Sequence, residues 1–506
     1  MSGRFSFPRG ELRARTVRGA LVTGAFLIGI DALVVAQGLI VTALLGPELI
    51  GLYGIVTVTV TTIVALKRVG IDEKFVQQEE GGEEEFSRAF TLELALSGAF
   101  TVALCALAPL VSAVYGDERL LGLMLAMAWL PLAMALQAPL WVFFRRMQYG
   151  RQRALQAIQP VVTFAVTVPL AVADFGVYSL VVGAGAGYVA AVVAAVVASP
   201  YRLRIRWERD AARRYVAFSA WILVATVATL VMQQGQVFAF DQAEGLRWVG
   251  FLTLAVMVTR YVDRADQIVT STIYPAIAAI QGRTATLAEL FAKSNRATLL
   301  WVVPFTVGLV LFAEDLLALV GEEWAAASLL VQGLAVVGLL QHLGFNWFAF
   351  YRAHGDTRPP AIEAVVRCVA FLALAVPGLV LAGDEGFVGG AVVAALVALA
   401  VRAVYVRRML PGVSWGAIAA PSAVAAAAAA GSALAVRGAL WGGPRPAWQA
   451  AGELAVFVCV FAAVALRLER RLVAELRAGL RPGEQGAGED RGDEREPGQL
   501  PVPVDR

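Results

Sequence analysis

The sequence predicts an all-α, polytopic membrane protein of about 14 transmembrane helices, in two six-helix bundles followed by a C-terminal helix pair. Hydrophobic residues make up 59% of the 506 residues, charged residues only 16%, and the mean hydropathy is +0.69. Soluble domains usually contain about 25% charged residues. The apolar residues gather in long runs, and the net charge of +3 does not favour nucleic acid as a partner.

The apolar runs divide the chain into fourteen candidate spans, most of them near the ~20 residues that cross a bilayer as a helix. In chain order they are 20–45, 49–66, 89–115, 120–144, 155–172, 177–199, 215–240, 246–267, 297–312, 324–350, 361–381, 387–401, 415–436 and 448–466. The Ala-rich thirteenth run is the least hydrophobic of the set, so a re-entrant or interfacial element there stays open.

The distribution of basic residues tests this segmentation independently. With the N-terminus in the cytoplasm, the predicted cytoplasmic stretches up to residue 481 contain 32 lysines and arginines and the opposite loops contain four. Cytoplasmic loops of membrane proteins carry an excess of Lys and Arg, and one miscounted helix would invert this pattern from that point on. The sequence therefore predicts a multi-pass protein of the cytoplasmic membrane with both termini cytoplasmic.

Six units follow from these spans. They are a basic cytoplasmic N-terminus (1–18), an N-terminal six-helix bundle (19–200), a basic cytoplasmic linker (201–214), a C-terminal six-helix bundle (215–404), helices 13 and 14 (413–467) and a cytoplasmic tail (468–506). The tail is rich in Gly, Pro and charge and poor in apolar residues, a composition typical of disorder.

A faint internal repeat relates the two bundles. The turn at 46–53 joins the first two spans, and the turn at 242–251 joins the seventh and eighth. Each has an acid, a glycine and an aromatic residue where the next span opens. Such repeats are common in secondary transporters, which move one bundle against the other around a central site. Gly183 and Gly187 add a GxxxG spacing, which favours close helix packing.

Several stretches resemble the polysaccharide or O-antigen flippases of the multidrug/oligosaccharidyl-lipid/polysaccharide exporter superfamily. They are LLGPELIGLYGIV (44–56), RVGIDEKFVQQEE (68–80), ADFGVYSLVVGAGAGY (173–188), STIYPAIAAIQGR (271–283), ALVGEEWAAASLLVQGLAVVGLL (318–340) and YRAHGDTRPPAIEAV (351–365). None is a catalytic signature, and helices 13 and 14 lie outside the resemblance.

The resemblance implies a two-lobed helical fold with a central cavity. It also implies transport, without enzymatic chemistry, of an undecaprenyl-pyrophosphate-linked oligosaccharide to the outer leaflet for surface polysaccharide (O-antigen or exopolysaccharide) biosynthesis. The expected partners are this lipid-linked sugar pyrophosphate, membrane lipid, and H⁺ or Na⁺ as a coupling ion, with polysaccharide assembly proteins as further candidates.

Asp31 is the candidate site for the coupling ion. It lies about 12 residues into the first span, or ~18 Å deep, near the middle of the bilayer. Gly24, Gly38 and Thr42 fall on the same helical face. An acid at that depth is costly and usually marks a transport pathway or a proton site. The alternative is a buried acid that is paired for packing alone.

Three basic residues lie within the spans or their polar extensions, and they are candidate pyrophosphate contacts: Arg260, Arg264 and Arg367, in that order. Guanidinium groups make paired, charge-assisted hydrogen bonds to phosphate oxygens. Thr253 and Gln267 share the face of Arg260 and complete the predicted substrate-binding set. Two alternatives stay open: Arg264 and Asp263 pair at the interface, and Glu363 partly neutralises Arg367 from one turn away.

Other polar residues are weaker candidates. His342 and Asn346, one turn apart, indicate a hydrogen-bonded core pair more than a cavity wall. Gln233, Gln234 and Gln236 are interpreted as a hydrated helix end near the outer surface, with contact to sugar hydroxyls as the alternative. The three cysteines lie inside apolar runs and there are two histidines, so the sequence predicts no metal site, and it indicates no cofactor.

Two other classes of function compete with a flippase. A multidrug or cation antiporter of the same superfamily would more usually have 12 helices and an acid-dominated cavity. An integral membrane sugar polymerase would be expected to show a large outer loop, and an acyltransferase would need a catalytic base, for which only His342 is available within the spans. No Walker A sequence is present, so the chain does not hydrolyse ATP by that route.

Overall fold

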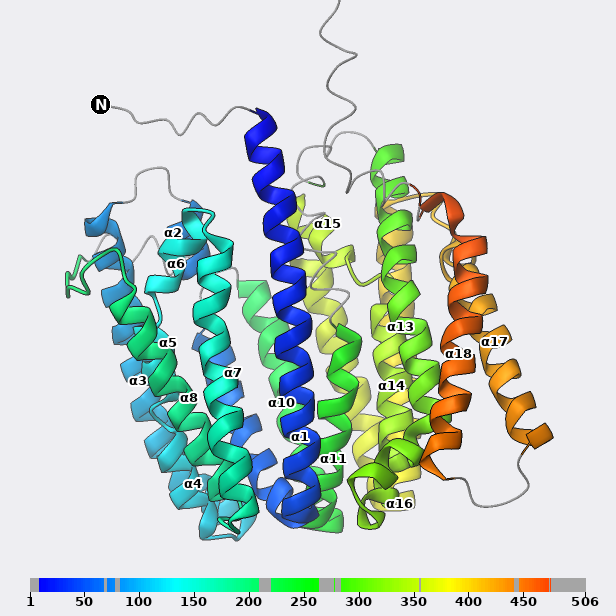
Figure 1. Cartoon of the computed structure of the whole chain (residues 1–506), viewed down its shortest axis with the longest axis horizontal. Coiled ribbons are helices and arrows are strands. Elements are labelled where there is room, and N and C mark those ends of the chain that lie inside the picture. The colour runs from blue at the N-terminus through cyan, green and yellow to red at the C-terminus, as the bar shows by residue number, and fades with distance from the viewer. Residues whose placement is uncertain are drawn as a thin grey trace, which may run out of the picture.

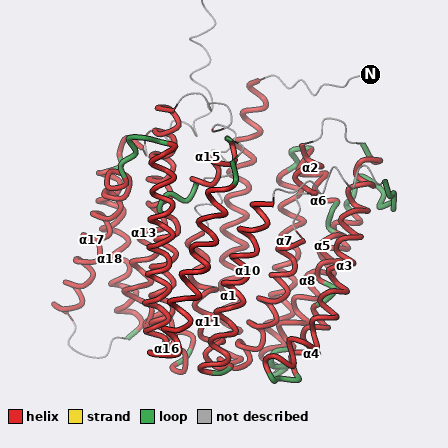
Figure 2. The backbone as a smooth tube through the Cα atoms, turned by 180° about the vertical axis from the view of Figure 1, so that it is seen from behind, coloured by secondary structure: helices red, strands yellow, loops and turns green. Residues whose placement is uncertain are grey.

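The computed structural model describes residues 9–67, 71–77, 82–208, 220–263, 277, 284–354, 356–440, 446–472 and 474. These residues form α-helices, short 3₁₀ helices and connecting turns, with no β-strand among them (Figure 2). Eleven helices within this part of the chain are long and apolar enough to cross a membrane. The predicted all-α, polytopic membrane fold is therefore confirmed.

The helices follow one another with short connections. They are α1 (Arg9–Lys67), α2 (Ile71–Gln77), α3 (Glu83–Tyr115), α4 (Arg119–Met127), α5 (Leu130–Leu136), α6 (Pro139–Arg145), α7 (Tyr149–Val172), α8 (Tyr178–Val197), α10 (Ala220–Glu244), α11 (Leu246–Thr259), η1 (Arg260–Asp263), α13 (Thr284–Val320), η2 (Glu322–Ala327), α14 (Ser328–His342), α15 (Trp347–Ala353), α16 (Arg358–Met409), α17 (Trp415–Leu440) and α18 (Ala447–Leu468).

Two of the long helices each contain a sharp turn, so each consists of two joined helices. Gly46 breaks α1 with φ 74° and ψ 169°, and Ala382 and Gly383 break α16, where Gly383 has φ 60°. Glycine is suited to positive φ because it has no Cβ, and Pro47 is suited to the first turn of the arm that follows. If the two arms of α1 and the two arms of α16 are counted separately, and α11 with η1 is added to the eleven candidate helices, the total is fourteen. The number of fourteen spans stays a proposal.

The helices gather into two groups (Figure 1). In the first, α7 packs against α8 and against α1, and α3 packs against α4 and α5. In the second, α14 packs against α13, α11 and α16, and α10 packs against α16. The terminal pair, α17 and α18, packs against α13. The helix that contains the ninth predicted span, 297–312, is longer than that span: α13 covers Thr284–Val320.

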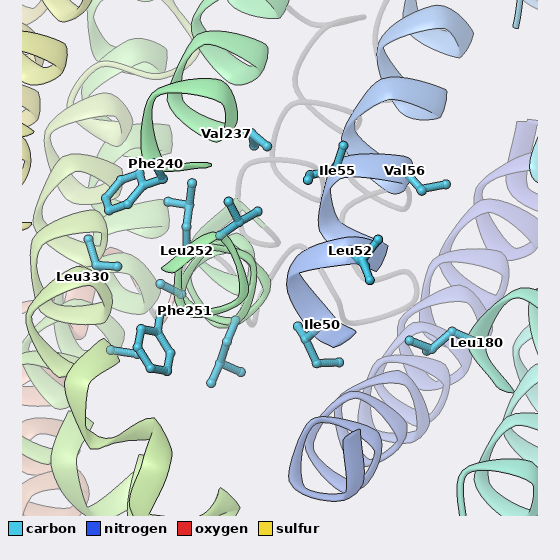
Figure 3. Packing of buried hydrophobic residues seen from close by; sticks show 14 of the residues in the cluster. Ile50, Leu52, Ile55, Val56, Leu180, Val237, Phe240, Phe251, Leu252 and Leu330 are labelled. Carbon is cyan, nitrogen blue, oxygen red and sulfur yellow. The ribbon is translucent and has the colours of Figure 1, made fainter. Parts of the chain in front are cut away.

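The two groups meet where α1 contacts α11. Apolar side chains from both sides fill this contact, including Leu52 and Val56 of α1, Val237 of α10, and Phe251 and Leu252 of α11 (Figure 3). All five side chains are almost fully buried. The main hydrophobic core therefore extends across both groups.

Reciprocal glycine contacts form the closest approach at this meeting point. A Cβ atom on Gly51 would lie 2.2 Å from the Leu246 carbonyl oxygen, and one on Gly250 would lie 1.9 Å from the Pro47 carbonyl oxygen. Positions 51 and 250, like positions 47 and 246, are 199 residues apart. The two contacts are thus equivalent under the predicted internal repeat.

The turns that carry these contacts also share their backbone shape. Gly46 has φ 74° and ψ 169°, and Gly245 has φ 86° and ψ 177°. Both glycines directly precede the helix that makes the contact. The predicted similarity of the two turns is confirmed at the level of conformation, and their backbones require a residue without a Cβ.

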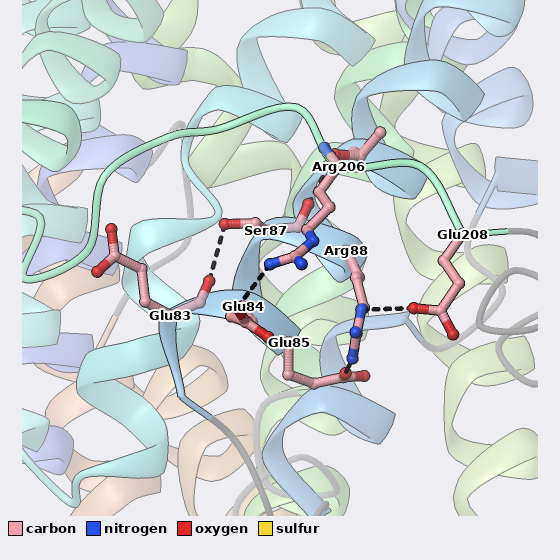
Figure 4. Close-up of polar contacts among 8 residues, drawn as sticks. Glu83, Glu84, Glu85, Ser87, Arg88, Arg206 and Glu208 are labelled. Carbon is pink, nitrogen blue, oxygen red and sulfur yellow. Dashed lines mark hydrogen bonds and ion pairs between the residues drawn. The ribbon is translucent and has the colours of Figure 1, made fainter.

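Ion pairs tie the start of α3 to the chain after α8, at the predicted cytoplasmic end (Figure 4). Arg206 lies 2.7 Å from Glu84, and Arg88 lies 2.7 Å from Glu208. The Arg206 amide also donates to Thr91 Oγ1 at 2.7 Å. The described part of the predicted basic linker is therefore held against the first bundle; residues 209–214 of it, and the predicted tail after residue 474, lie outside the described residues.

Candidate functional site

A cavity of about 190 Å³ lies among four elements of the second group. Residues of α10, α11 with η1, α14 and both arms of α16 line it. Its polar lining residues are Gln233, Gln236, Thr259, Arg260, Asp263, Gln341 and Arg367. The structure thus brings together Arg260 and Arg367, which are more than 100 positions apart in the sequence. Their role as substrate contacts stays a prediction.

Both arginines lie on the wall of this cavity without a carboxylate partner among the described residues. Arg260 is exposed and begins η1, directly after α11 ends. Arg367 is half-buried on the first arm of α16, and its buried Nε atom has no hydrogen-bond partner in the described part of the chain. A guanidinium cannot lose its proton at physiological pH, so each position holds a fixed positive charge.

Several other cations within the described helices are paired with carboxylates. Four such pairs join helices or their ends: Lys67 with Glu93 (2.5 Å), Arg296 with Glu469 (2.6 Å), Arg402 with Glu363 (3.0 Å) and Arg437 with Glu453 (2.9 Å). In each pair the carboxylate side chain is at most 12% exposed. The cavity arginines differ from these structural pairs, because their charge is available to a ligand.

Glu363 pairs with Arg402 and not with Arg367, although the sequence left a Glu363–Arg367 interaction open. Its Oε1 accepts a hydrogen bond from Arg402 Nη2 at 3.0 Å. Arg402 also donates to the carbonyl oxygens of Gln341 and Leu343. Spacing along one helix suggested the Glu363–Arg367 interaction, but the second arm of α16 folds back and supplies a better-placed guanidinium. The sequence left this alternative open, and the residue that pairs with Glu363 instead is 39 positions away.

Asp263 lies on the cavity wall beside His342. The Asp263 Oδ1 to His342 Nε2 distance is 3.3 Å, and His342 Nδ1 is 2.7 Å from the Gly338 carbonyl oxygen. A carbonyl oxygen only accepts hydrogen bonds, so this contact is a hydrogen bond in the tautomer that carries the proton on Nδ1. The alternative Asp263–Arg264 pairing involves a residue outside the described part of the chain.

His342 and Asn346 do not bond to each other, although both are buried polar residues as expected. Asn346 donates to Ser294 Oγ at 2.6 Å and accepts from Asn295 Nδ2 at 2.8 Å. This network joins Asn346 to α13 and has a structural role. The interpretation of Asn346 as a core residue is confirmed.

The glutamines of α10 are not at a hydrated helix end. α10 runs from Ala220 to Glu244, so Gln233 and Gln236 lie well inside it, and both line the cavity. Gln234 points elsewhere and donates to Thr62 Oγ1 of α1 at 3.2 Å. The helix-end interpretation was wrong because the apolar run alone placed the end of the helix too early.

Of the remaining predicted site residues, Thr253 lies away from the cavity. Thr253 Oγ1 donates to the Val249 carbonyl oxygen at 2.7 Å and packs against Gly54 of α1, away from the cavity. Arg264 and Gln267 lie outside the described residues. Sequence reasoning did not single out Thr259 or Gln341, and only proximity to Arg260 and His342 could have suggested them.

Asp31 is half-buried on the first arm of α1 and does not line the cavity. The stripe on which it lies does face the second group: a Cβ on Gly38 would lie 2.7 Å from Met257 Sδ of α11, and Thr42 is buried. The predicted orientation of the stripe toward other helices is therefore confirmed at Gly38 and Thr42. The role of Asp31 in ion coupling stays a prediction.

The chemistry of the cavity favours an anion with several oxygen acceptors. Two guanidinium groups and three amide groups supply hydrogen-bond donors, and Asp263 is the single acidic residue among the described lining residues. Arginine binds phosphate oxygens through paired N–H groups. A cationic ligand would meet two like charges here.

Comparison with known proteins places the chain in a family. Residues 40–329 match the family described as "Polysaccharide biosynthesis protein". No curated protein sequence matches the chain. Among solved structures, the "Lipid II flippase MurJ, inward closed conformation" has a TM-score of 0.68 at 12% identity, covering 90% of this chain and 100% of that chain.

A second solved structure is described as an "inward-facing conformation of a multidrug resistance MATE family transporter of the MOP superfamily". It has a TM-score of 0.59 at 15% identity and covers 78% of this chain and 100% of that chain. Identities this low establish the fold alone. The chain is thus a multi-pass membrane protein that belongs to the polysaccharide biosynthesis protein family and has the fold shared by MurJ and the MATE transporters.

Proposed function

We propose that this protein is a flippase that moves an undecaprenyl-pyrophosphate-linked oligosaccharide across the cytoplasmic membrane for surface polysaccharide biosynthesis. One observation carries the proposal: Arg260 and Arg367, unpaired among the described residues, share the wall of one cavity in a member of the polysaccharide biosynthesis family. A pyrophosphate crossing a low-dielectric interior needs fixed cations along its path, because an unpaired charge there is very costly.

The proposed movement is alternating access of the two helix groups. The contacts of Gly51 with Leu246 and of Gly250 with Pro47 hold the groups together at the predicted outer end. Separation of this contact would open the cavity toward the outer leaflet. In the proposed orientation both termini are cytoplasmic, and Asp31 binds the coupling ion. A cation antiporter is less well supported, since two arginines face the cavity.

The test is export in a flippase-null strain that expresses variants of this chain. Arg260→Gln and Arg367→Gln should each reduce surface polysaccharide by at least tenfold at equal membrane levels, because each loses charge-assisted hydrogen bonds of about 1.5–3 kcal/mol. Arg260→Lys should restore export only in part, since lysine lacks the planar fork.

The matched control is Arg247→Gln. Arg247 lies on α11, which directly precedes the η1 helix of Arg260, and it is exposed, but its guanidinium packs over the Phe251 ring and does not line the cavity. Export by this variant should equal that of the wild type. Full export by Arg260→Gln with Arg367→Gln in one chain would exclude both residues, and with them the proposed pyrophosphate site.

A further inference from the structure

A second and larger cavity, of about 390 Å³, lies in the first helix group. Its lining comes from α2, the chain around α5 and α6, α7 and α8. The volume falls within the roughly 300–1,000 Å³ typical of small-molecule sites. No lysine or arginine is among its described lining residues, and Asp72, which is exposed, is the single charged one. Its chemistry therefore differs from that of the cavity at Arg260.

Amide side chains dominate its polar wall. Gln152, Gln156 and Gln159 repeat along one face of α7, and Gln137 faces them from the end of α5. Residues at spacings of three and four positions share a helical face, so the three amides form a continuous row. Gln156 Oε1 accepts a hydrogen bond from Arg153 Nη1 at 2.9 Å, which holds this side chain in one orientation.

Gln152 is the residue of the row with an unsatisfied buried hydrogen-bond acceptor. Its side chain is 9% exposed, and no described residue donates a hydrogen bond to its buried Oε1 atom. A buried amide oxygen without a donor costs about 1–3 kcal/mol, so such groups are rare in folded proteins and invite a ligand donor. Gln152 thus places an amide with an unsatisfied acceptor in the cavity wall.

Aromatic rings complete the lining. Trp141, Phe144 and Tyr188 line the cavity together with the glutamines. Trp141 is held against Phe75, with ring centroids 6.3 Å apart, and Phe144 packs edge-on to Tyr149. Aromatic faces pack well on apolar ring surfaces while a polar rim supplies hydrogen bonds. A ligand with alternating C–H faces and hydroxyl groups matches this wall.

We propose that this cavity binds sugar rings of the lipid-linked oligosaccharide, as a subsite separate from the arginine cavity that binds the pyrophosphate. The inference rests on the proposed function and names the part of the substrate that the first helix group recognises. A pyrophosphate would find no lysine or arginine among the described lining residues, and an acyl chain would leave the amides of Gln137, Gln152 and Gln159 without partners. A neutral, polyhydroxylated ring satisfies both the amides and the aromatic faces.

The experiment measures binding of two lipids to the full chain in lipid nanodiscs. One probe is the undecaprenyl-pyrophosphate-linked oligosaccharide extracted from the strain that carries this chain, and the other is undecaprenyl pyrophosphate without sugar. Gln152→Met removes the amide with little change in volume. It should weaken binding of the sugar-bearing lipid about tenfold, as expected for one or two lost hydrogen bonds, and leave binding of the bare lipid unchanged.

Two further variants separate the possible outcomes. Arg260→Gln should weaken binding of both lipids, and Gln148→Leu, an exposed glutamine one turn before Gln152, should affect neither. Equal binding of the sugar-bearing lipid by Gln152→Met and the wild type, or an equal loss for both lipids, would overturn the sugar subsite alone. Failure of the wild-type protein to bind either lipid would overturn the proposed function together with the subsite.

Discussion

Some positively charged side chains within the helices form structural ion pairs, and others line a cavity. The two kinds differ in how much stability their removal should cost. Arg402 and Glu363 are both buried and neutralise each other across the two arms of α16. Removing one partner of such a pair leaves an uncompensated charge, which typically costs about 3–5 kcal/mol. Arg367 lies one turn from Glu363, but no described carboxylate would lose its partner if Arg367 were replaced. The same substitution at the two arginines should therefore affect stability very differently.

Arg402→Gln should destabilise the protein by about 3–5 kcal/mol, since Glu363 would remain buried without its cation. Arg367→Gln should leave stability unchanged or slightly higher, because it removes a charge that no described carboxylate compensates. Thermal unfolding of both variants in the same detergent gives the comparison. Equal losses of thermal stability would mean that Arg367 is also a structural residue.

At the scale of elements, small residues determine how closely the helices of the first group pack. A Cβ on Gly183 would lie 1.8 Å from Thr167 Oγ1, and one on Gly187 would lie 2.1 Å from Thr163 Oγ1. The GxxxG spacing predicted this close packing, and the structure confirms it. The Gln159 carbonyl oxygen would be 2.7 Å from a Cβ on Gly187, so the same contact positions part of the glutamine row.

Gly187→Leu should therefore force α7 and α8 apart and lower thermal stability, by about 1–3 kcal/mol if the helices can adjust. Gly98→Leu on α3 is the control, because no atom lies within 4 Å of a Cβ at that position. Detergent-solubilised yield and melting temperature report the difference. If both glycine variants melted at the same temperature, the α7–α8 contact would not depend on a missing side chain.

At the scale of the whole molecule, the two helix groups touch through backbone as well as side chains. The reciprocal contacts of Gly51 and Gly250 need no specific side-chain partner, so at these two contacts the surfaces can separate without breaking a hydrogen bond or an ion pair. This kind of contact suits a rigid-body movement between two packed units. It is also sensitive to any increase in size at either glycine.

Gly250→Leu should prevent full closure of the predicted outer end, because a Cβ there already overlaps the Pro47 carbonyl group. In a chain with Cys105, Cys368 and Cys459 replaced by serine, a Gln236→Cys reporter on the cavity wall should react faster with an impermeant maleimide added outside. Gly431→Leu, where a Cβ has open space, should leave the rate unchanged. A rate unaffected by Gly250→Leu would argue against closure at this contact.

Local pattern was sufficient for the features that depend on neighbouring residues. Apolar runs predicted the helices because a bilayer-spanning backbone must satisfy its own hydrogen bonds. The turns at Gly46 and Gly245, and the close packing at Gly183 and Gly187, follow from residue types at short spacings. Limits of helices were less predictable: α13 extends beyond its apolar run, since amphipathic turns at a helix end lower the hydropathy without ending the helix.

The sequence by itself determined that this chain is a helical membrane protein with two related halves and few intramembrane cations. Only the tertiary structure decided which cations are free to bind a ligand. Glu363 could have paired with Arg367 or with Arg402. It pairs with Arg402, because the second arm of α16 folds back against the first. Likewise, the glutamines of α7 and α10 became cavity walls through helix packing. The partners of charged and amide side chains come from helices that are distant in the sequence, so spacing along one helix cannot predict them.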